Sequence, residues 1–212
     1  MINIKAKIQK KKIAFVCQRY GVEVNGGAEA YCRMYAERLR DAYDVDVYTT
    51  CAVDYVTWKN EYRLGKEILN GVTVRRYPVE SPRDNLSFNK LCGYVLTNPN
   101  HTDEEEWRWI DEQGPLCPKL IAALKRDYAR YHAVIFVTYL YYLTVKGLLL
   151  DLPNAILIPT VHDEPTVYLR CYDRVFDVAK GFVWNTPEER SFAERRFPGI
   201  AGRPGIDRKS VV

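Results

Sequence analysis

The sequence predicts an α/β fold, with a Rossmann-like, doubly wound and mainly parallel sheet of about six strands. Short apolar runs of strand length alternate with segments of helical period along most of the 212 residues. The composition, 47% hydrophobic and 27% charged, is typical of globular proteins. Strands separated by helices need crossover connections, which favour parallel pairing. We expect the strand order 3-2-1-4-5-6, with a binding site at the carboxyl ends of the first, fourth and fifth strands.

The first third of the chain contains three strand-like segments and one helix. A continuous β-branched and aromatic run comes first, as is typical of a strand covered on both faces. After Gly26-Gly27, apolar residues recur at three- and four-residue spacing, which predicts an amphipathic helix. Asn70-Gly71 predicts a hairpin turn between residues 66–69 and the third strand. The expected strands are residues 13–17, 45–50 and 72–77, and the helix is 28–39.

The rest of the chain continues the alternation. The last helix begins near Pro187, with Thr186 as its N-cap and Glu189 completing a capping box. From Gly199 on, the composition is that of a linker or an added tail, so we expect a domain over 1–198 and a tail over 199–212. Strands are expected over 133–137, 155–159 and 181–184, and the other helices over 84–97, 103–110, 116–131, 140–149 and 167–177.

Charge and cysteine content disfavour several classes of protein. The net charge of +4 is smaller than the contribution of the five lysines between Lys5 and Lys12, so nucleic-acid binding has little support. The six cysteines form no C-x-x-C pair and only three histidines accompany them, which disfavours a zinc site. We interpret them as reduced packing residues. No apolar run approaches the roughly 20 residues of a membrane span, and 13–17 is too short for a signal-peptide core. We expect a cytoplasmic protein.

The first candidate site is the loop between the first strand and the first helix. Gly26 and Gly27 remove side chains where a ligand could approach the backbone, and the helix start beyond them suits a phosphate group. The alternative is a turn that needs glycine for its dihedral angles. The spacing is not G-x-G-x-x-G, and the second strand ends without an acidic residue to bind a ribose. A dinucleotide-dependent oxidoreductase or epimerase is therefore disfavoured.

The second candidate site is the segment Thr160-Val161-His162-Asp163-Glu164-Pro165, directly after the fifth strand. A histidine beside two carboxylates at a carboxyl strand end can orient a sugar hydroxyl. The alternative is that a carboxylate caps the next helix while the histidine packs. Aromatic residues are expected around the same opening, where their faces would serve as platforms for sugar rings. These residues are Tyr20, Tyr139, Tyr141, Tyr142 and Trp184. For two of Tyr139, Tyr141 and Tyr142, packing of the following helix is at least as good an explanation.

Three segments together resemble the N-terminal domain of retaining, family-four GT-B glycosyltransferases. Residues 15–29, with Asn25-Gly26-Gly27-Ala28-Glu29, resemble the start of that domain. Thr160-Val161-His162-Asp163 is similar to its strand-end histidine motif, and 185–189 to its later strand-to-helix step. The resemblance covers about residues 12–198.

The resemblance implies a sugar-transferring enzyme built from two Rossmann-like domains that face each other across a cleft. The N-terminal domain binds a glycan or small-molecule acceptor, and the C-terminal domain holds the nucleotide-sugar donor. Backbone amides at Gly26 and Gly27 would meet the donor diphosphate, His162 would contact the transferred sugar, and Asp163 is a further catalytic candidate. The transfer proceeds with retention and needs no metal or other cofactor. We assign acceptor or sugar contact to Tyr20, Glu29 and Tyr139.

The chain ends where the resemblance places the interdomain linker, so the donor-binding domain lies outside it. We therefore expect the acceptor half of a glycosyltransferase, for example in polysaccharide biosynthesis, with little or no turnover alone. An exposed cleft wall would favour weak self-association. The alternative from another class is a stand-alone Rossmann-like module that binds a nucleotide or another anion at the same opening.

Overall fold

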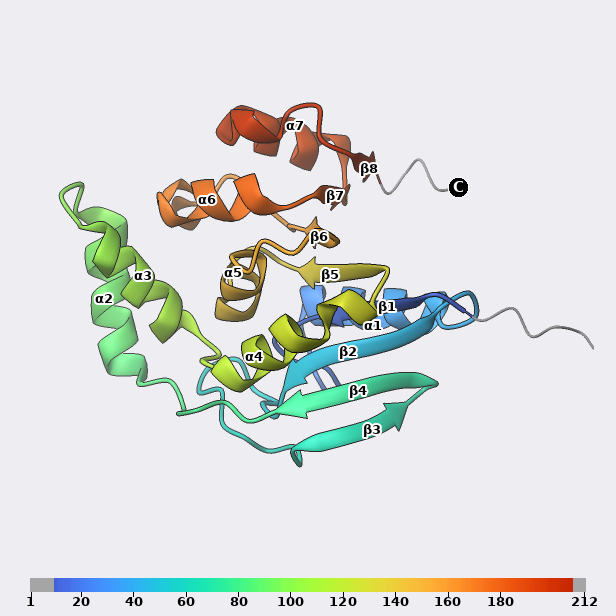
Figure 1. Cartoon of the computed structure of the whole chain (residues 1–212). Coiled ribbons are helices and arrows are strands. Elements are labelled where there is room, and N and C mark those ends of the chain that lie inside the picture. Colours follow the sequence, from blue (N-terminus) through green and yellow to red (C-terminus); the bar gives the residue numbers. More distant parts are fainter. Residues whose placement is uncertain (1–9, 208–212) are drawn as a thin grey trace, which may run out of the picture.

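The computed structural model describes residues 10–207, which build one eight-stranded sheet flanked by helices (Figure 1). The strand order is β3-β4-β2-β1-β5-β6-β7-β8. Every neighbouring pair is parallel except β3 and β4, which are antiparallel. The strands are β1 (Lys12–Val16), β2 (Asp44–Thr50), β3 (Gly65–Leu69), β4 (Val72–Tyr77), β5 (Ala133–Val137), β6 (Ala155–Ile158), β7 (Gly181–Trp184) and β8 (Gly205–Asp207).

The six strands predicted from the sequence form the interior of this sheet in the predicted order, since β4-β2-β1-β5-β6-β7 corresponds to 3-2-1-4-5-6. The α/β, doubly wound and mainly parallel fold is therefore confirmed. β3 joins β4 through the hairpin turn at Asn70 and Gly71, whose φ angles of 49° and 81° are the positive values that a type I′ turn requires.

The helices follow the predicted segments with shifted ends. The longest predicted helix is shorter than expected, because α4 ends at Asp127 and a 3-10 turn follows. The helix expected over 167–177 is interrupted, since Leu169 is extended between a 3-10 turn at Pro165–Tyr168 and α6. The helices are α1 (Gly27–Leu39), α2 (Asn85–Thr97), α3 (Asp103–Gln113), α4 (Pro118–Asp127), α5 (Tyr142–Leu148), α6 (Cys171–Val178) and α7 (Pro187–Arg196).

Part of the expected tail is folded. β8 pairs in parallel with β7. Ile200, which precedes β8 in the chain, is buried in the larger of the apolar clusters, the main core. The described structure thus continues past residue 198 to Asp207. Residues 208–212, and Lys5 and Lys7 of the basic N-terminal stretch, lie outside the described residues.

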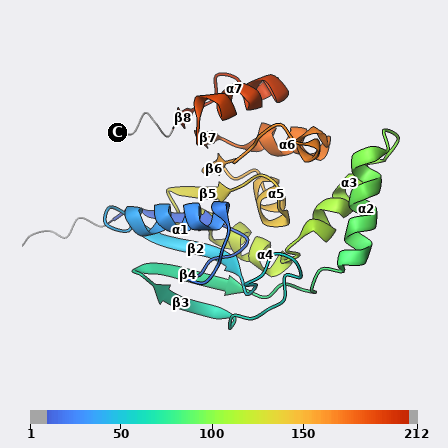
Figure 2. The ribbon, with the colours of Figure 1, turned by 180° about the vertical axis from the view of Figure 1, so that it is seen from behind.

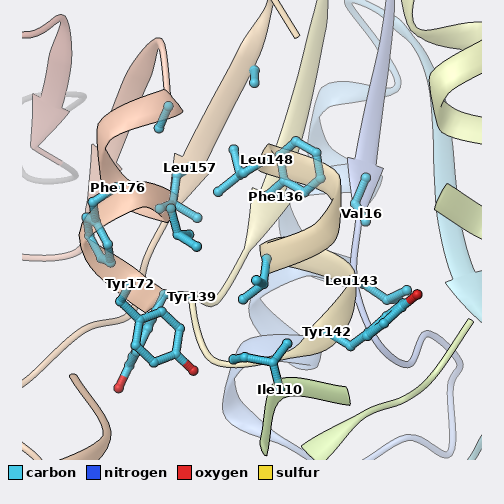
Figure 3. Close-up of a cluster of buried hydrophobic side chains, with 14 of the residues drawn as sticks. Val16, Ile110, Phe136, Tyr139, Tyr142, Leu143, Leu148, Leu157, Tyr172 and Phe176 are labelled. Atoms are coloured by element: carbon cyan, nitrogen blue, oxygen red, sulfur yellow. The ribbon is translucent and has the colours of Figure 1, made fainter. Parts of the chain in front are cut away.

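Two apolar clusters pack against the two faces of the sheet. In Figure 1, α4 lies in front of the sheet and α1 behind it, and Figure 2 shows the reverse. The larger cluster joins α4, α5, α6 and α7 to one face, whereas α1 supplies every described helical residue of the cluster on the other. Figure 3 shows Phe136 of β5 and Leu157 of β6 beside Leu148 of α5.

The cysteines and helices fit a packed domain. All six cysteines are free, and five of them are buried. None of the helices between residues 10 and 207 combines the length and the apolar character that crossing a membrane requires.

Two helical glycines offer a test of the packing between α5 and β5. An added Cβ at Gly147 would lie 2.3 Å from the Phe136 ring, whereas one at Gly93, on the exposed side of α2, would meet nothing within 4 Å. We expect Gly147→Ala to lower the free energy of unfolding by about 1–3 kcal/mol through overpacking. Gly93→Ala should raise it by about 0.5–1 kcal/mol, because alanine is the better helix former.

Urea denaturation followed by circular dichroism measures both changes. Equal effects of the two substitutions would contradict the close approach of α5 to β5.

Candidate functional site

A hollow of about 330 Å³ lies at the carboxyl ends of β1, β5 and β6. Both candidate segments from the sequence border it. Residues 25–29 form one side, and Thr160, His162 and Glu164 form another, with 138–141 between them. Chain segments more than 130 positions apart thus meet at one sheet edge, as a doubly wound sheet predicts. The expectation that Gly26-Gly27 and His162 share one opening is confirmed.

A buried ion pair forms the floor of this pocket. Arg19 follows β1, Glu29 lies in the first turn of α1, and both side chains are only 6% exposed. Nη2 of Arg19 lies 2.6 Å from Oε1 of Glu29, and Nε donates a hydrogen bond to the same oxygen at 2.9 Å. The side-chain amide of Gln18 donates a third bond to it, also at 2.9 Å. The charge of Arg19 is therefore neutralised within the loop.

The same arginine fixes the rest of the loop. Its Nη2 donates to the carbonyl of Asn25 at 2.9 Å, and Nη1 donates to the carbonyl of Val53 at 2.8 Å. Its guanidinium also lies under the ring of Tyr55, 5.3 Å from the centroid. Tyr55 is 57% exposed and lines the pocket. One side chain thus joins the β1–α1 loop to the loop after β2 and supports an aromatic face at the pocket.

The two glycines have different roles in the fold. Gly26 has φ 153°, and an added Cβ would lie 2.2 Å from Oε2 of Glu29 and 2.9 Å from Nη2 of Arg19. Gly26 is therefore required by the loop itself. Gly27 begins α1, and a Cβ there would meet nothing within 4 Å. The N-cap of α1 is Gly26, and within residues 10–207 no side chain caps the first N–H groups of the helix. The fold leaves the backbone at Gly27 open.

Strained backbone marks the other side of the pocket. Thr138 directly follows β5 and has φ 62°, and Thr160, two residues after β6, has φ 52°. Both residues line the pocket. A β-branched residue with positive φ is a genuine outlier, and such strain persists where the surroundings over-determine it, often at functional sites.

His162 lies at the opening of the pocket with Glu164 beside it. The imidazole is 71% exposed, and its Nε2 lies 3.5 Å from Oε2 of Glu164. The other oxygen of Glu164 accepts a 2.5 Å hydrogen bond from the hydroxyl of Tyr139, which also lies 2.9 Å from Oγ1 of Thr166. Burial, together with Glu164, raises the pKa of Tyr139. Tyr139 therefore remains a neutral donor that holds the carboxylate in place.

Glu189 anchors the backbone that carries His162. One carboxylate oxygen accepts the N–H of Val161 at 2.8 Å, and the other accepts the N–H of Asn185 at 2.6 Å. Thr186 caps α7 as predicted, because its hydroxyl oxygen accepts the N–H of Glu189. The carboxylate of Glu189, however, mainly binds the two neighbouring loops, and does not serve chiefly to complete the predicted capping box. Burial raises the pKa of Glu189. The residue holds the loops after β6 and β7 together.

Several residues expected at the opening lie elsewhere. Tyr20 is fully buried in the cluster under α1, so the sequence expectation that it contacts a ligand is wrong. Trp184 stacks on Phe182 within the main core, and Tyr142 is buried at the start of α5. Tyr139 and Glu29 do line the pocket, but both are buried and already hydrogen-bonded, which makes them supports for neighbouring groups.

Of the two carboxylates after His162, the one that the sequence predicted to face the pocket does not line it, and the other does. Asp163 is exposed, accepts a hydrogen bond from the hydroxyl of Tyr168 at 2.8 Å, and is not among the pocket residues. Glu164 takes the place at the pocket that the sequence interpretation gave to Asp163. Arg19 and Tyr55 were also missed. The six-residue motif after β6 contains Glu164, but no sequence pattern signals the other two.

Comparisons with models of known protein families and with curated proteins find no match to this chain. Within residues 10–207, no group of three or more histidine, cysteine, aspartate or glutamate side chains is arranged to hold a metal ion. The arrangement at the pocket is suited to binding: open backbone amides, an exposed imidazole and an exposed aromatic ring converge on one hollow.

The contrast between the two glycines gives a stability test of the loop. Gly26→Ala combines an unfavourable φ with a collision against the Arg19–Glu29 pair, and we expect it to lower the free energy of unfolding by about 2–3 kcal/mol. Gly27→Ala is the matched control and should leave stability unchanged or slightly raised.

Thermal melts of the two variants beside the wild type measure the difference. If Gly27→Ala destabilises as much as Gly26→Ala, the backbone at Gly27 is not open in the way described.

Proposed function

We propose that this chain provides the acceptor-side domain of a retaining GT-B glycosyltransferase, which moves a sugar from a nucleotide-sugar donor to an acceptor hydroxyl. The observation that carries the proposal is the single pocket bordered by Gly26-Gly27 and His162. The motifs that resemble this class of enzyme lie more than 130 positions apart, and the fold brings them to one sheet edge. That juxtaposition is what a shared donor and acceptor site requires.

The open end of α1 would meet the donor diphosphate. The backbone at Gly27 has free space in front of it, and uncapped N–H groups with the positive end of the helix dipole favour an anion there. Arg19 contributes no free charge, because Glu29 neutralises it. Further positive charge must therefore come from a group outside this pocket, which the proposal assigns to the donor-binding domain.

The opposite side of the pocket would hold the sugar. His162 is exposed and can hydrogen-bond a hydroxyl of the transferred sugar, while Glu164 sets the orientation of the imidazole from 3.5 Å away. The exposed ring of Tyr55 offers an apolar face of the kind that packs against sugar rings. Hydrogen bonds from one side and stacking from the other would position the acceptor hydroxyl beside the anomeric carbon.

In the proposed reaction, the bond between the anomeric carbon and the diphosphate oxygen breaks as the acceptor oxygen forms a new bond on the same face. The departing phosphate takes the acceptor's proton. The transition state carries developing charge on the leaving diphosphate, which helix amides stabilise. A domain on the far side of the cleft would complete donor binding and exclude water. We accordingly expect little turnover from residues 1–212 in the absence of such a domain.

A second candidate function is an independent module that binds a nucleotide or another anion. The uncapped N-terminus of α1 favours it, since it could bind an anion without a second domain. Isothermal titration of the chain with nucleoside diphosphates distinguishes the two. Micromolar binding indicates the module, and very weak binding is what half of a transferase should give.

Two substitutions in the complete enzyme test the proposal. Gly27→Val puts a side chain where the diphosphate would lie, so transfer should be lost while the melting temperature is retained. His162→Ala should lower kcat by about 100-fold, the scale on which removal of one positioned donor acts. His132→Ala is the matched control, since His132 is an exposed histidine next to the amino end of β5.

Sugar transfer from a panel of nucleotide-sugars is the measurement. Full activity of Gly27→Val would remove the phosphate role from this loop. A collapse of the melting temperature in His162→Ala would indicate a packing role for the histidine.

A further inference from the structure

A second hollow, of about 270 Å³, lies beside the first at the same end of the sheet. Its walls come from the loops after β2 and β4, the start of α2 and the end of α3. The two hollows have a common wall, because Trp58 of the second packs edge-on against Tyr141 of the first, with ring centroids 5.5 Å apart. A molecule bound in the first pocket could therefore extend towards the second.

Arg83 projects a cation into this hollow from the loop after β4. Its guanidinium contacts two rings, 5.1 Å from the Trp58 centroid and 4.6 Å from that of Phe88. Nη2 donates to the backbone carbonyl and to the side-chain oxygen of Gln113. Nε is buried and has no acceptor in the part of the chain that the structure describes. Burial lowers the pKa of Arg83, yet an arginine remains charged at neutral pH.

Arg83 has no direct ion pair among residues 10–207, since no carboxylate there lies within ion-pair distance of its guanidinium, and the charge of Asp54 acts on it only from farther away. Three acidic side chains border the hollow, but each is committed to another partner. Asp84 accepts the N–H groups of Leu86 and Ser87, Glu112 pairs with Arg108 at 2.7 Å, and Asp111 pairs with Lys146 at 2.8 Å. The hollow thus contains a cation that no side chain within residues 10–207 pairs with directly.

We propose that this second hollow binds an oxyanion, a carboxylate or a phosphate, through Arg83. Gln113 takes the hydrogens of Nη2, which leaves Nη1 of the planar guanidinium to donate a charge-assisted hydrogen bond to either group. The hydrogen bonds to Gln113 and the contacts with the two rings already hold the guanidinium, so little side-chain entropy is lost when the anion binds. An anion would also supply the direct ion-pair partner that the half-buried cation does not have among residues 10–207.

The position of the hollow identifies the source of the oxyanion as the acceptor. This part of the inference rests on the proposed function, because it takes the first pocket to hold the reacting hydroxyl. The acceptor would then carry its charged group beyond the wall formed by Trp58 and Tyr141. The binding of an oxyanion at Arg83 does not depend on that assignment.

Direct binding of inorganic phosphate and of acetate to the chain tests the site. The probe is the Nε–H signal of Arg83 in an ¹H–¹⁵N spectrum, which should move on titration because a bound anion supplies charge beside that group. Arg83→Gln should weaken phosphate binding about tenfold or more, since it removes a charge-assisted hydrogen bond. Arg83→Lys should retain part of the binding. Arg190→Gln is the control, since Arg190 lies on α7 and pairs with Glu194.

The outcomes separate this inference from the proposed function. An unmoved Arg83 signal at saturating phosphate and acetate, or unchanged affinity in a folded Arg83→Gln, overturns the subsite whatever the enzyme does. If Arg83→Gln fails to fold, the wild-type titration and Arg83→Lys decide. In the complete enzyme, Arg83→Lys should raise the KM of an acidic acceptor more than that of its neutral analogue. Equal effects on both would overturn the acceptor assignment. If the complete enzyme does not bind the donor, with or without the Arg83 substitution, that result would count against the proposed function alone.

Discussion

The buried ion pair between Arg19 and Glu29 is the interaction on which the site depends. One carboxylate oxygen receives two guanidinium contacts and the amide of Gln18, and the same guanidinium reaches two backbone carbonyls in separate loops. Removing one partner of such a pair leaves an uncompensated buried charge, at a cost of about 3–5 kcal/mol. The loop therefore has one favoured conformation. In that conformation Gly27 presents its backbone to open space, and Tyr55 lies over the pocket.

The interior of the sheet was predictable because the patterns that specify it are strong. Strands covered on both faces read as continuous apolar runs, and the rule for crossover connections leaves few possible orders. The sequence patterns of the two edge strands, β3 and β8, are weaker. β8 has three residues, all at least partly exposed, so no apolar pattern distinguishes residues 205–207 from a linker. The residues of β3 are mostly exposed, and the Asn70-Gly71 turn was the one sequence signal that indicated this strand.

The meeting of the two motifs was predictable, and the direction of individual side chains was not. The strand-end rule needs only the positions of Gly26 and His162 in the chain. Whether Asp163 or Glu164 faces the pocket depends on the path of the backbone after Thr160, whose positive φ no sequence pattern announces. The path of the backbone after β1 likewise determines that Tyr20 points into the core. Arg19 and Tyr55 enter the site through contacts between two loops, which local periodicity cannot show.

The central claim is that the start of α1 and the loop carrying His162 form one ligand site. Chemical-shift changes of backbone amides on addition of a nucleoside diphosphate-sugar test it most directly, because they detect even weak binding. The account predicts that the amides of residues 27–29 and 160–162 shift together along one binding curve. Shifts confined to one of these segments, or located elsewhere on the sheet, would contradict it.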